Sequence, residues 1–147
     1  MQNVRIYEIP DCKMVSSGCG MFGDGVLERF SDWMETLPHS IYPLDFLFYD
    51  NEKQGFVWLY IYTEDMEIPD GFELVDFKGG LYAVANDIDG ETDTDAMGAE
   101  VDKFLAEHGF ERDASRPELG NVITTPAAKA VLGYDQMDYW TPIKPIK

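Results

Sequence analysis

Short runs in which apolar and polar residues alternate occur along the whole chain, and each run predicts a β-strand. The first two, residues 4–9 and 13–16, lie on either side of a turn at Pro10. The polar segment 50–55 ends in glycine and joins two further runs into a predicted hairpin. The remaining predicted strands are residues 44–49, 56–62, 81–85, 119–125 and 137–143.

Two longer segments carry apolar residues at the spacing of one helix face, which predicts two helices. The first spans residues 26–37, and Asp24 is its expected cap. The second spans residues 94–108, is capped at its first residue or the one before, and ends at Gly109. A loose loop is expected before the first helix, because four glycines cluster there, at positions 18, 20, 23 and 25.

The order strand, helix, strand, strand therefore occurs twice, which predicts an α+β fold built from a duplicated β-α-β-β unit. We expect a curved, mainly antiparallel sheet, two helices on its outer face and a central ligand cavity where the two copies meet. Residues 1–147 should form one domain with pseudo-repeats at about residues 1–70 and 71–147. Because the two halves share no obvious sequence identity, the repeat is one of pattern alone.

The charge of the chain restricts its partners. It carries 28 acidic residues against 11 Lys and Arg, a formal net charge of −17. Such a charge repels phosphate backbones and anionic membrane surfaces, so neither direct nucleic-acid binding nor a membrane partner is expected, whereas cations are attracted. No signal peptide or membrane-length apolar run is visible, which predicts a cytoplasmic protein. The sequence leaves the oligomeric state open.

No metal, cofactor or catalytic residue can be assigned from the sequence. Cys12 and Cys19 are expected to be reduced thiols, and His39 and His108 are too far away in sequence to complete a metal site with them. Neither a nucleophile-elbow motif nor a zinc-protease motif is present. The sequence thus predicts neither a hydrolase triad nor a metalloprotease, and favours binding over catalysis.

The last predicted strand places one acid between large apolar residues. Alternation puts Asp138 and Trp140 on one face of this strand, and in the first copy it puts Trp58 and Tyr60 together on one face. An acid among aromatic side chains suits an apolar cation, since cation–π contacts would add to the charge attraction. The alternative is that Asp138 points to solvent and that the aromatic residues simply pack a half-buried sheet.

Five segments in this order resemble the GyrI-like, or AraC-type, effector-binding domains, which occur alone or fused to DNA-binding regulators of multidrug response. These segments are residues 6–10, 79–84, 104–110, 116–118 and 138–143. The resemblance spans almost the whole chain and implies a duplicated β-α-β-β fold around a ligand cavity. It implies that Asp138 stands where drug-binding members place a glutamate, and that Glu118 matches a second acidic position. Tyr82 and Phe48 are expected to line the same cavity.

The sequence therefore favours a binding protein for small hydrophobic, often cationic molecules, linked to transcription regulation by the resemblance. Two alternatives remain. One is a hydrolase in which Asp138 or Glu118 acts as general base on water. The other is a protein-interaction module of the gyrase-inhibitor type, whose acidic surface docks on a basic partner such as a topoisomerase.

Overall fold

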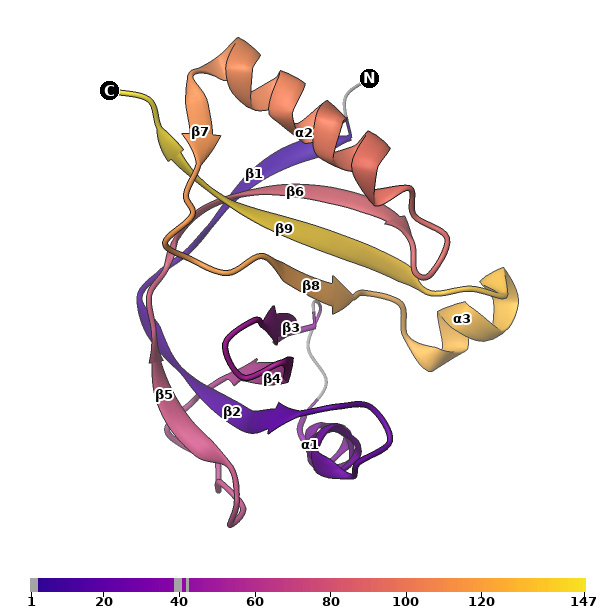
Figure 1. Ribbon diagram of the computed structural model, residues 1–147. Helices are drawn as coiled ribbons and strands as arrows, with labels where there is room; N and C mark the ends of the chain where they lie inside the picture. Colours follow the sequence, from indigo (N-terminus) through magenta and orange to yellow (C-terminus); the bar gives the residue numbers. More distant parts are fainter. Residues whose placement is uncertain (1–2, 39–40, 42) are drawn as a thin grey trace. The chain divides into compact units, whose positions relative to one another are not determined.

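A computed structural model of the protein describes residues 3–38, 41 and 43–147. The chain forms two compact units, one from residues 11–78 and one from residues 1–10 together with 79–147. The described residues contain three helices and nine strands, and the strands within each unit pair antiparallel (Figure 1). The predicted α+β class with a mainly antiparallel sheet is confirmed.

The unit of residues 11–78, here called the 11–78 unit, contains four strands and one helix. Its strands lie in the order β3-β4-β2-β5. Helix α1 covers one face of this sheet, where Phe30 packs with Val15, Tyr60 and Phe72. The elements are β2 (Cys12–Gly20), α1 (Val26–Glu35), β3 (Asp45–Asp50), β4 (Gly55–Ile61) and β5 (Glu73–Phe77).

The other unit, here called the terminal unit, combines β1 with the second half of the chain. Its strands lie in the order β1-β6-β9-β8, with β7 paired to β9. Helix α2 covers one face, where Val101 and Leu105 pack on Ala83, Ala85 and Ile143 (Figure 1). The elements are β1 (Val4–Ile9), β6 (Gly80–Ile88), α2 (Thr94–His108), β7 (Phe110–Arg112), β8 (Leu119–Val122), α3 (Pro126–Leu132) and β9 (Gln136–Pro145).

Both units follow one plan, which confirms the predicted duplication. A long strand, β2 or β6, leads into a helix, and a pair of strands follows, β3 with β4 or β8 with β9. In the terminal unit the short strand β7 is inserted between the helix and this pair. The second strand of that pair, β4 or β9, returns to the long strand. A further strand, β5 or β1, pairs with the other edge of the long strand. Because β1 belongs to the terminal unit, the compact units are not the contiguous halves of the sequence. The proposed repeat boundaries at about residue 70 stay a prediction.

The helix ends follow the local sequence closely. Helix α2 starts after Asp93, whose carboxylate accepts a hydrogen bond from the Ala96 backbone, and it ends at Gly109 in the left-handed conformation. Helix α1 differs from the prediction in that its N-cap is Gly25. Asp24 still contributes, because its carboxylate accepts from the backbone N–H groups of Met21 and Val26.

Two segments depart from the predicted elements. The expected glycine loop is wrong for Gly18 and Gly20, because β2 continues to Gly20 after an irregularity between Ser16 and Cys19. Gly18 has a φ of 77°, which only glycine adopts readily, so the strand bends there instead of ending. In addition, the segment between the last two predicted strands contains a third helix, α3, which starts at a proline after Thr125.

Candidate functional site

The 11–78 unit contains an acid among aromatic side chains, and this acid is Asp45. Asp45 opens β3 and lies opposite Tyr60 of β4, while Leu47 lies opposite Trp58. Because directly paired residues of antiparallel strands share a face, Asp45, Trp58 and Tyr60 all project toward the side that α1 covers. The indole Nε1 of Trp58 donates a hydrogen bond of 2.9 Å to Oδ2 of Asp45.

The charge of Asp45 is poorly compensated. Burial raises the pKa of Asp45, and the hydrogen bond from Trp58 offsets this only in part. The pKa of Tyr60 is raised too, by burial and then by the negative charge of Asp45. Within residues 3–38, 41 and 43–147, no Lys or Arg forms an ion pair with Asp45. The structure thus holds a half-buried carboxylate that has one hydrogen-bond donor from another residue and no counter-ion.

A pocket of about 510 Å³ opens next to this acid, although Asp45 itself is not among the described lining residues. Leu44 and Tyr60, the residues before and opposite Asp45, both line it, and Trp33 of α1 forms an aromatic wall. The rings of Trp33 and Tyr60 lie edge to face, with centroids 6.0 Å apart. The described lining residues are Trp33, Thr36, Leu37, Pro38, Leu44, Tyr60, Thr63, Asp65, Met66 and Glu67.

The charged groups at this pocket are acidic. Asp65 and Glu67 are both exposed, and no Lys or Arg is among the described lining residues. The hydroxyl of Thr63 donates to Asp65 over 2.6 Å and lowers the pKa of that carboxyl, which therefore stays ionised. A second hollow of about 570 Å³ near Cys12 differs, because two Asp and two Lys side chains line it. Among their described lining residues, the pocket beside Asp45 combines two aromatic rings, Trp33 and Tyr60, with charged groups that are all acidic, whereas the second hollow has one aromatic ring, Phe77, and charges of both signs.

The 11–78 unit around the pocket carries a large excess of acidic residues. Residues 11–78 carry 14 Asp and Glu against four Lys and Arg, a formal net charge of −10. Two of the four basic side chains are already engaged: Lys13 pairs with Asp76, and Arg29 lies over the ring of Phe72. The net charge of this unit therefore favours the approach of a cation to the pocket.

The terminal unit contains the acid that the sequence analysis selected. Asp138 lies opposite Asn86 and, with Trp140, projects from the sheet face that α2 does not cover. The amide of Asn86 donates to Asp138 over 3.0 Å, and the indole of Trp140 donates to Asn121, also over 3.0 Å. Asp138 is half-buried rather than fully solvent-exposed.

Of the other predicted site residues, Tyr82 lies on the same face as Asp138, whereas Phe48 and Glu118 do not. Tyr82 is fully buried and lies edge to face with Trp140, with centroids 5.7 Å apart, so these two share the face of Asp138. Phe48 lies opposite Val57, on the face of its sheet that is turned away from α1. Glu118 is exposed and forms an ion pair with Arg112 over 3.0 Å. Whether any of these residues binds a ligand stays a prediction.

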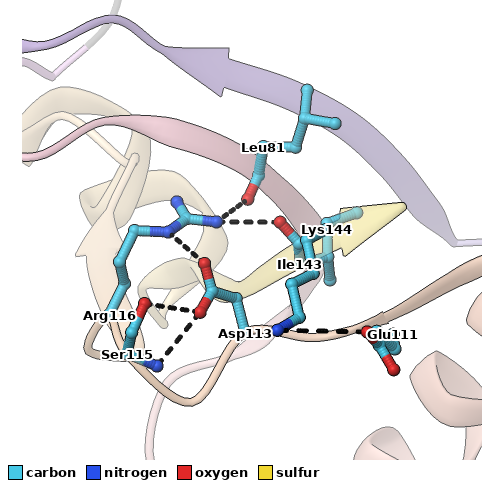
Figure 2. Close-up of polar contacts among 7 residues, drawn as sticks. All are labelled: Leu81, Glu111, Asp113, Ser115, Arg116, Ile143 and Lys144. Carbon is cyan, nitrogen blue, oxygen red and sulfur yellow. Dashed lines mark hydrogen bonds and ion pairs between the residues drawn. The ribbon is translucent and has the colours of Figure 1, made fainter. Parts of the chain in front are cut away.

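The buried side chain of Arg116 contacts Asp113 and the backbone of Leu81 and Ile143 (Figure 2). The guanidinium of Arg116 stacks over the Tyr82 ring at 4.7 Å and donates from Nε to Asp113. Its Nη2 donates to the backbone carbonyls of Leu81 and Ile143 over 2.9 and 2.8 Å, which ties it to β6 and β9. Nη1 is buried without a hydrogen-bond acceptor in the described structure. This cluster is structural, since its donors face strand backbone.

Asp45 and Trp33 are the residues that the sequence analysis missed. One signal for Asp45 was present, namely a single acid between Leu44 and Phe46 in an otherwise apolar run. Its significance depends on the hairpin register, which sets it diagonally opposite Trp58. Trp33 falls within the predicted helix 26–37, but its place at the pocket depends on packing that no sequence pattern specifies.

The described residues contain no group of three or more His, Cys, Asp and Glu side chains that could hold a metal ion, and His39 lies outside them. None of the described helices is both long enough and apolar enough to cross a membrane.

Solved structures share this fold at low sequence identity. No family model and no curated protein matches the sequence. The C-terminal domain of EcmrR superposes with a TM-score of 0.62 at 10% identity, covering 97% of this chain and 98% of that one. In the EcmrR–DNA complex the TM-score is 0.65 at 11% identity, and 97% of this chain matches only 57% of the longer EcmrR chain.

Two further solved structures, a hydrolase and a ligand-bound protein, share the fold. A hydrolase from Listeria innocua has a TM-score of 0.66 at 13% identity, covering 97% of this chain and 92% of that one. SAV2435 bound to tetraphenylphosphonium has a TM-score of 0.53 at 10% identity, covering 96% and 93%. At these sequence identities the likeness establishes the fold alone, so the function has to be argued from the residues of the site.

Proposed function

We propose that this chain is a binding protein for small organic cations with an apolar body, and that the pocket beside Asp45 is its binding site. The observation that carries the proposal is the combination of the Trp33 and Tyr60 rings with charged groups that are all acidic. The pocket volume of about 510 Å³ is in the range of small-molecule sites.

Cation–π contacts and charge attraction both favour a cation over a neutral ligand. A cation over the face of Trp33 or Tyr60 would gain about 0.5–2 kcal/mol per contact. Two charges ~4 Å apart attract by about 1 kcal/mol in water but about 4 kcal/mol at the effective dielectric constant near a protein surface. The acids among the described lining residues, Asp65 and Glu67, are exposed, so the attraction of each for a cation lies nearer the lower of these two values.

The shared fold supports this proposal. SAV2435 is bound to tetraphenylphosphonium, an organic cation, and EcmrR is found in a complex with DNA. These likenesses, together with the resemblance to GyrI-like domains, support effector binding linked to transcription regulation as the wider role. The expected cytoplasmic location fits that role and stays a prediction.

The test uses a matched pair of ligands and the indole N–H signals of the three tryptophans. The cation meta-(trimethylammonio)phenol and the neutral meta-tert-butylphenol have nearly the same shape. Trp33→Phe, Trp58→Phe and Trp140→Phe assign the three signals in nitrogen–proton correlation spectra. We expect the cation to shift the Trp33 signal at concentrations at least ~10-fold lower than the neutral ligand does, in line with the charge terms above.

The same titration separates the two candidate acids. If the cation shifts only the Trp140 signal, and Asp138→Asn abolishes that shift, the site lies at the predicted residues of the terminal unit. The proposal for the pocket beside Asp45 is then wrong. A cation that shifts no indole signal contradicts small-cation binding at either site.

A hydrolase is the second candidate function, favoured by one observation. The raised pKa of Asp45 suits a general base more than an exposed carboxyl does, and a hydrolase from Listeria innocua shares the fold. Turnover of a labile ester, lost in Asp45→Asn, would support it. Of the two acids considered for this role from sequence, Glu118 is exposed and paired with Arg112, and Asp138 is half-buried in the terminal unit.

A further inference from the structure

Resting on the proposed function, we propose that the pocket selects protonated amines, which carry N–H groups, over quaternary ammonium ions with the same apolar body. The ligand packs its apolar body against the rings of Trp33 and Tyr60 and donates N–H hydrogen bonds to acceptors that line the pocket. Net charge and aromatic rings favour both kinds of cation, so the choice between them depends on the hydrogen-bonding groups of the pocket.

Both threonine hydroxyls among the described lining residues have already given their hydrogen to another group. The hydroxyl of Thr36 donates to the backbone carbonyl of Trp33 over 2.7 Å, and the hydroxyl of Thr63 donates to Asp65 over 2.6 Å. A hydroxyl whose hydrogen is engaged can still accept a hydrogen bond through its oxygen lone pairs. Together with the carboxylates of Asp65 and Glu67, these side chains therefore present acceptors to a ligand.

The two carboxylates that line the pocket are not neutralised by basic side chains. In the part of the chain that the structure describes, no Lys or Arg forms an ion pair with Asp65 or Glu67. Because both acids are exposed, an ammonium group beside them keeps part of its hydration shell. The cost of removing water from the ammonium group therefore stays small, which favours an amine that forms hydrogen bonds there.

The pocket also lies at the C-terminal end of helix α1. Trp33 belongs to the last turn of this helix, and residues 36–38, which also line the pocket, follow the helix directly. The last carbonyls of a helix carry a partial negative charge, which favours a cation nearby. The last turn of α1 contains no basic residue. The helix end therefore favours the same ligand as the carboxylates, namely a hydrogen-bond donor with a positive charge.

These groups distinguish between the two kinds of cation. A quaternary ammonium ion carries no N–H group and suits a closed aromatic cage, in which cation–π contacts take the place of hydrogen bonds. A protonated primary amine carries N–H donors that need acceptors when they leave water. The described lining offers two aromatic rings but four side chains that accept, namely Thr36, Thr63, Asp65 and Glu67. This balance favours the amine.

The experiment compares phenethylammonium, phenethyltrimethylammonium and the neutral phenethyl alcohol, which share one apolar body. Dissociation constants are measured from the Trp33 indole signal at about pH 7, where the amine is protonated, and at ~0.15 M salt, which screens the long-range field of the acidic unit beyond about 8 Å. The wild type is compared with Asp65→Asn combined with Glu67→Gln, the lining variant. The matched control combines Glu64→Gln with Asp70→Asn, because these two acids are exposed in the same segment but are not among the described lining residues.

We expect the wild type to bind the protonated amine at least ~5-fold more tightly than the quaternary ion, because only the amine donates to the acceptors. The lining variant should lose roughly 3- to 10-fold in amine affinity, as expected for contacts with exposed carboxylates. It should lose less affinity for the quaternary ion, whose retained binding shows that the pocket is folded. The control variant should stay within about 2-fold of the wild type for all three ligands.

Two outcomes overturn the selection while leaving cation binding intact. One is a quaternary ion that binds as tightly as the amine. The other is an equal loss of amine affinity in the lining variant and in the control, which would assign the effect to the net charge of the unit. If neither cation shifts the Trp33 signal, or if the neutral alcohol binds as tightly as both cations, the proposed function itself is wrong.

Discussion

The side chains of Asp45 and Trp58 join diagonally across the β3–β4 hairpin, where the indole donates to the carboxylate over 2.9 Å. Trp58 lies directly opposite Leu47, and Asp45 lies directly opposite Tyr60, so the bond connects neighbouring rungs of the ladder. This bond fixes the indole of Trp58 and leaves the Tyr60 ring to line the pocket. The hairpin register therefore positions both Asp45 and the Tyr60 ring.

Asp45→Asn should change the pH dependence of stability in a defined direction. Because burial raises the folded-state pKa of Asp45, its favourable contribution is fully present below the ordinary aspartate value of 3.8. That contribution is lost as the pH rises through the raised folded-state pKa. At neutral pH, Asp45→Asn should therefore be at least as stable as the wild type, because Asn keeps an acceptor for Trp58 without the charge.

Urea unfolding of both proteins at about pH 7 and about pH 4.5 checks this prediction. The advantage of Asp45→Asn should shrink or reverse at the lower pH. A variant that is clearly less stable than the wild type at neutral pH would show that the charge of Asp45 is compensated in the folded state. Asp138→Asn, measured in parallel, leaves Asp45 in place and serves as the comparison.

Asp113 should show the opposite dependence. Hydrogen bonds from Ser115, followed by the bond from Arg116, lower the pKa of Asp113 well below its usual range. A lowered folded-state pKa gives stability that is present above 3.8 and is lost as the pH falls. Asp113→Asn should therefore lower the melting temperature at neutral pH, since buried Arg116 loses its counter-charge, and the difference from the wild type should narrow toward about pH 3.

Figure 2 contains a matched control for this experiment. Glu111 and Lys144 form a longer ion pair of 3.9 Å, with both side chains about half exposed. Glu111→Gln removes one charge of this exposed pair and should change the free energy of unfolding by less than about 0.5–1 kcal/mol at any pH. Equal losses in Asp113→Asn and Glu111→Gln would mean that burial of Arg116 has no energetic consequence.

Trp33→Leu should weaken binding of the cationic phenol by removing one aromatic wall of the pocket. The loss of one cation–π contact of about 0.5–2 kcal/mol corresponds to roughly 2- to 30-fold in the dissociation constant. Isothermal titration calorimetry measures the change, since the Trp33 signal is lost in this variant. Trp140→Leu is the control, and an equal loss in both variants would contradict a site confined to the pocket beside Asp45.

The sequence predicts local features better than it predicts sites. Helix α2 follows directly from Asp93 and Gly109, because caps act over a few neighbouring residues. Strand β2 was shortened in the prediction, because Gly18 can either end a strand or bend it, and only the pairing with β4 and β5 decides. Asp45 was overlooked because the residues around it belong to β4 and α1, which lie elsewhere in the sequence.

Gly80 and Gly98 should respond to alanine in opposite directions. Gly80 has a φ of 149°, and a Cβ there would lie 2.6 Å from Nη1 of Arg116, whose guanidinium is held by Asp113 and two carbonyls. Gly80→Ala should therefore cost roughly 1–3 kcal/mol through overpacking and backbone strain. Gly98 lies inside α2, and its nearest contact for an added methyl is Arg112 at 3.8 Å, so Gly98→Ala should stabilise by about 0.5–1 kcal/mol. Thermal unfolding of both variants measures the two shifts, and a Gly80→Ala protein as stable as the wild type would show that the Arg116 cluster can rearrange freely.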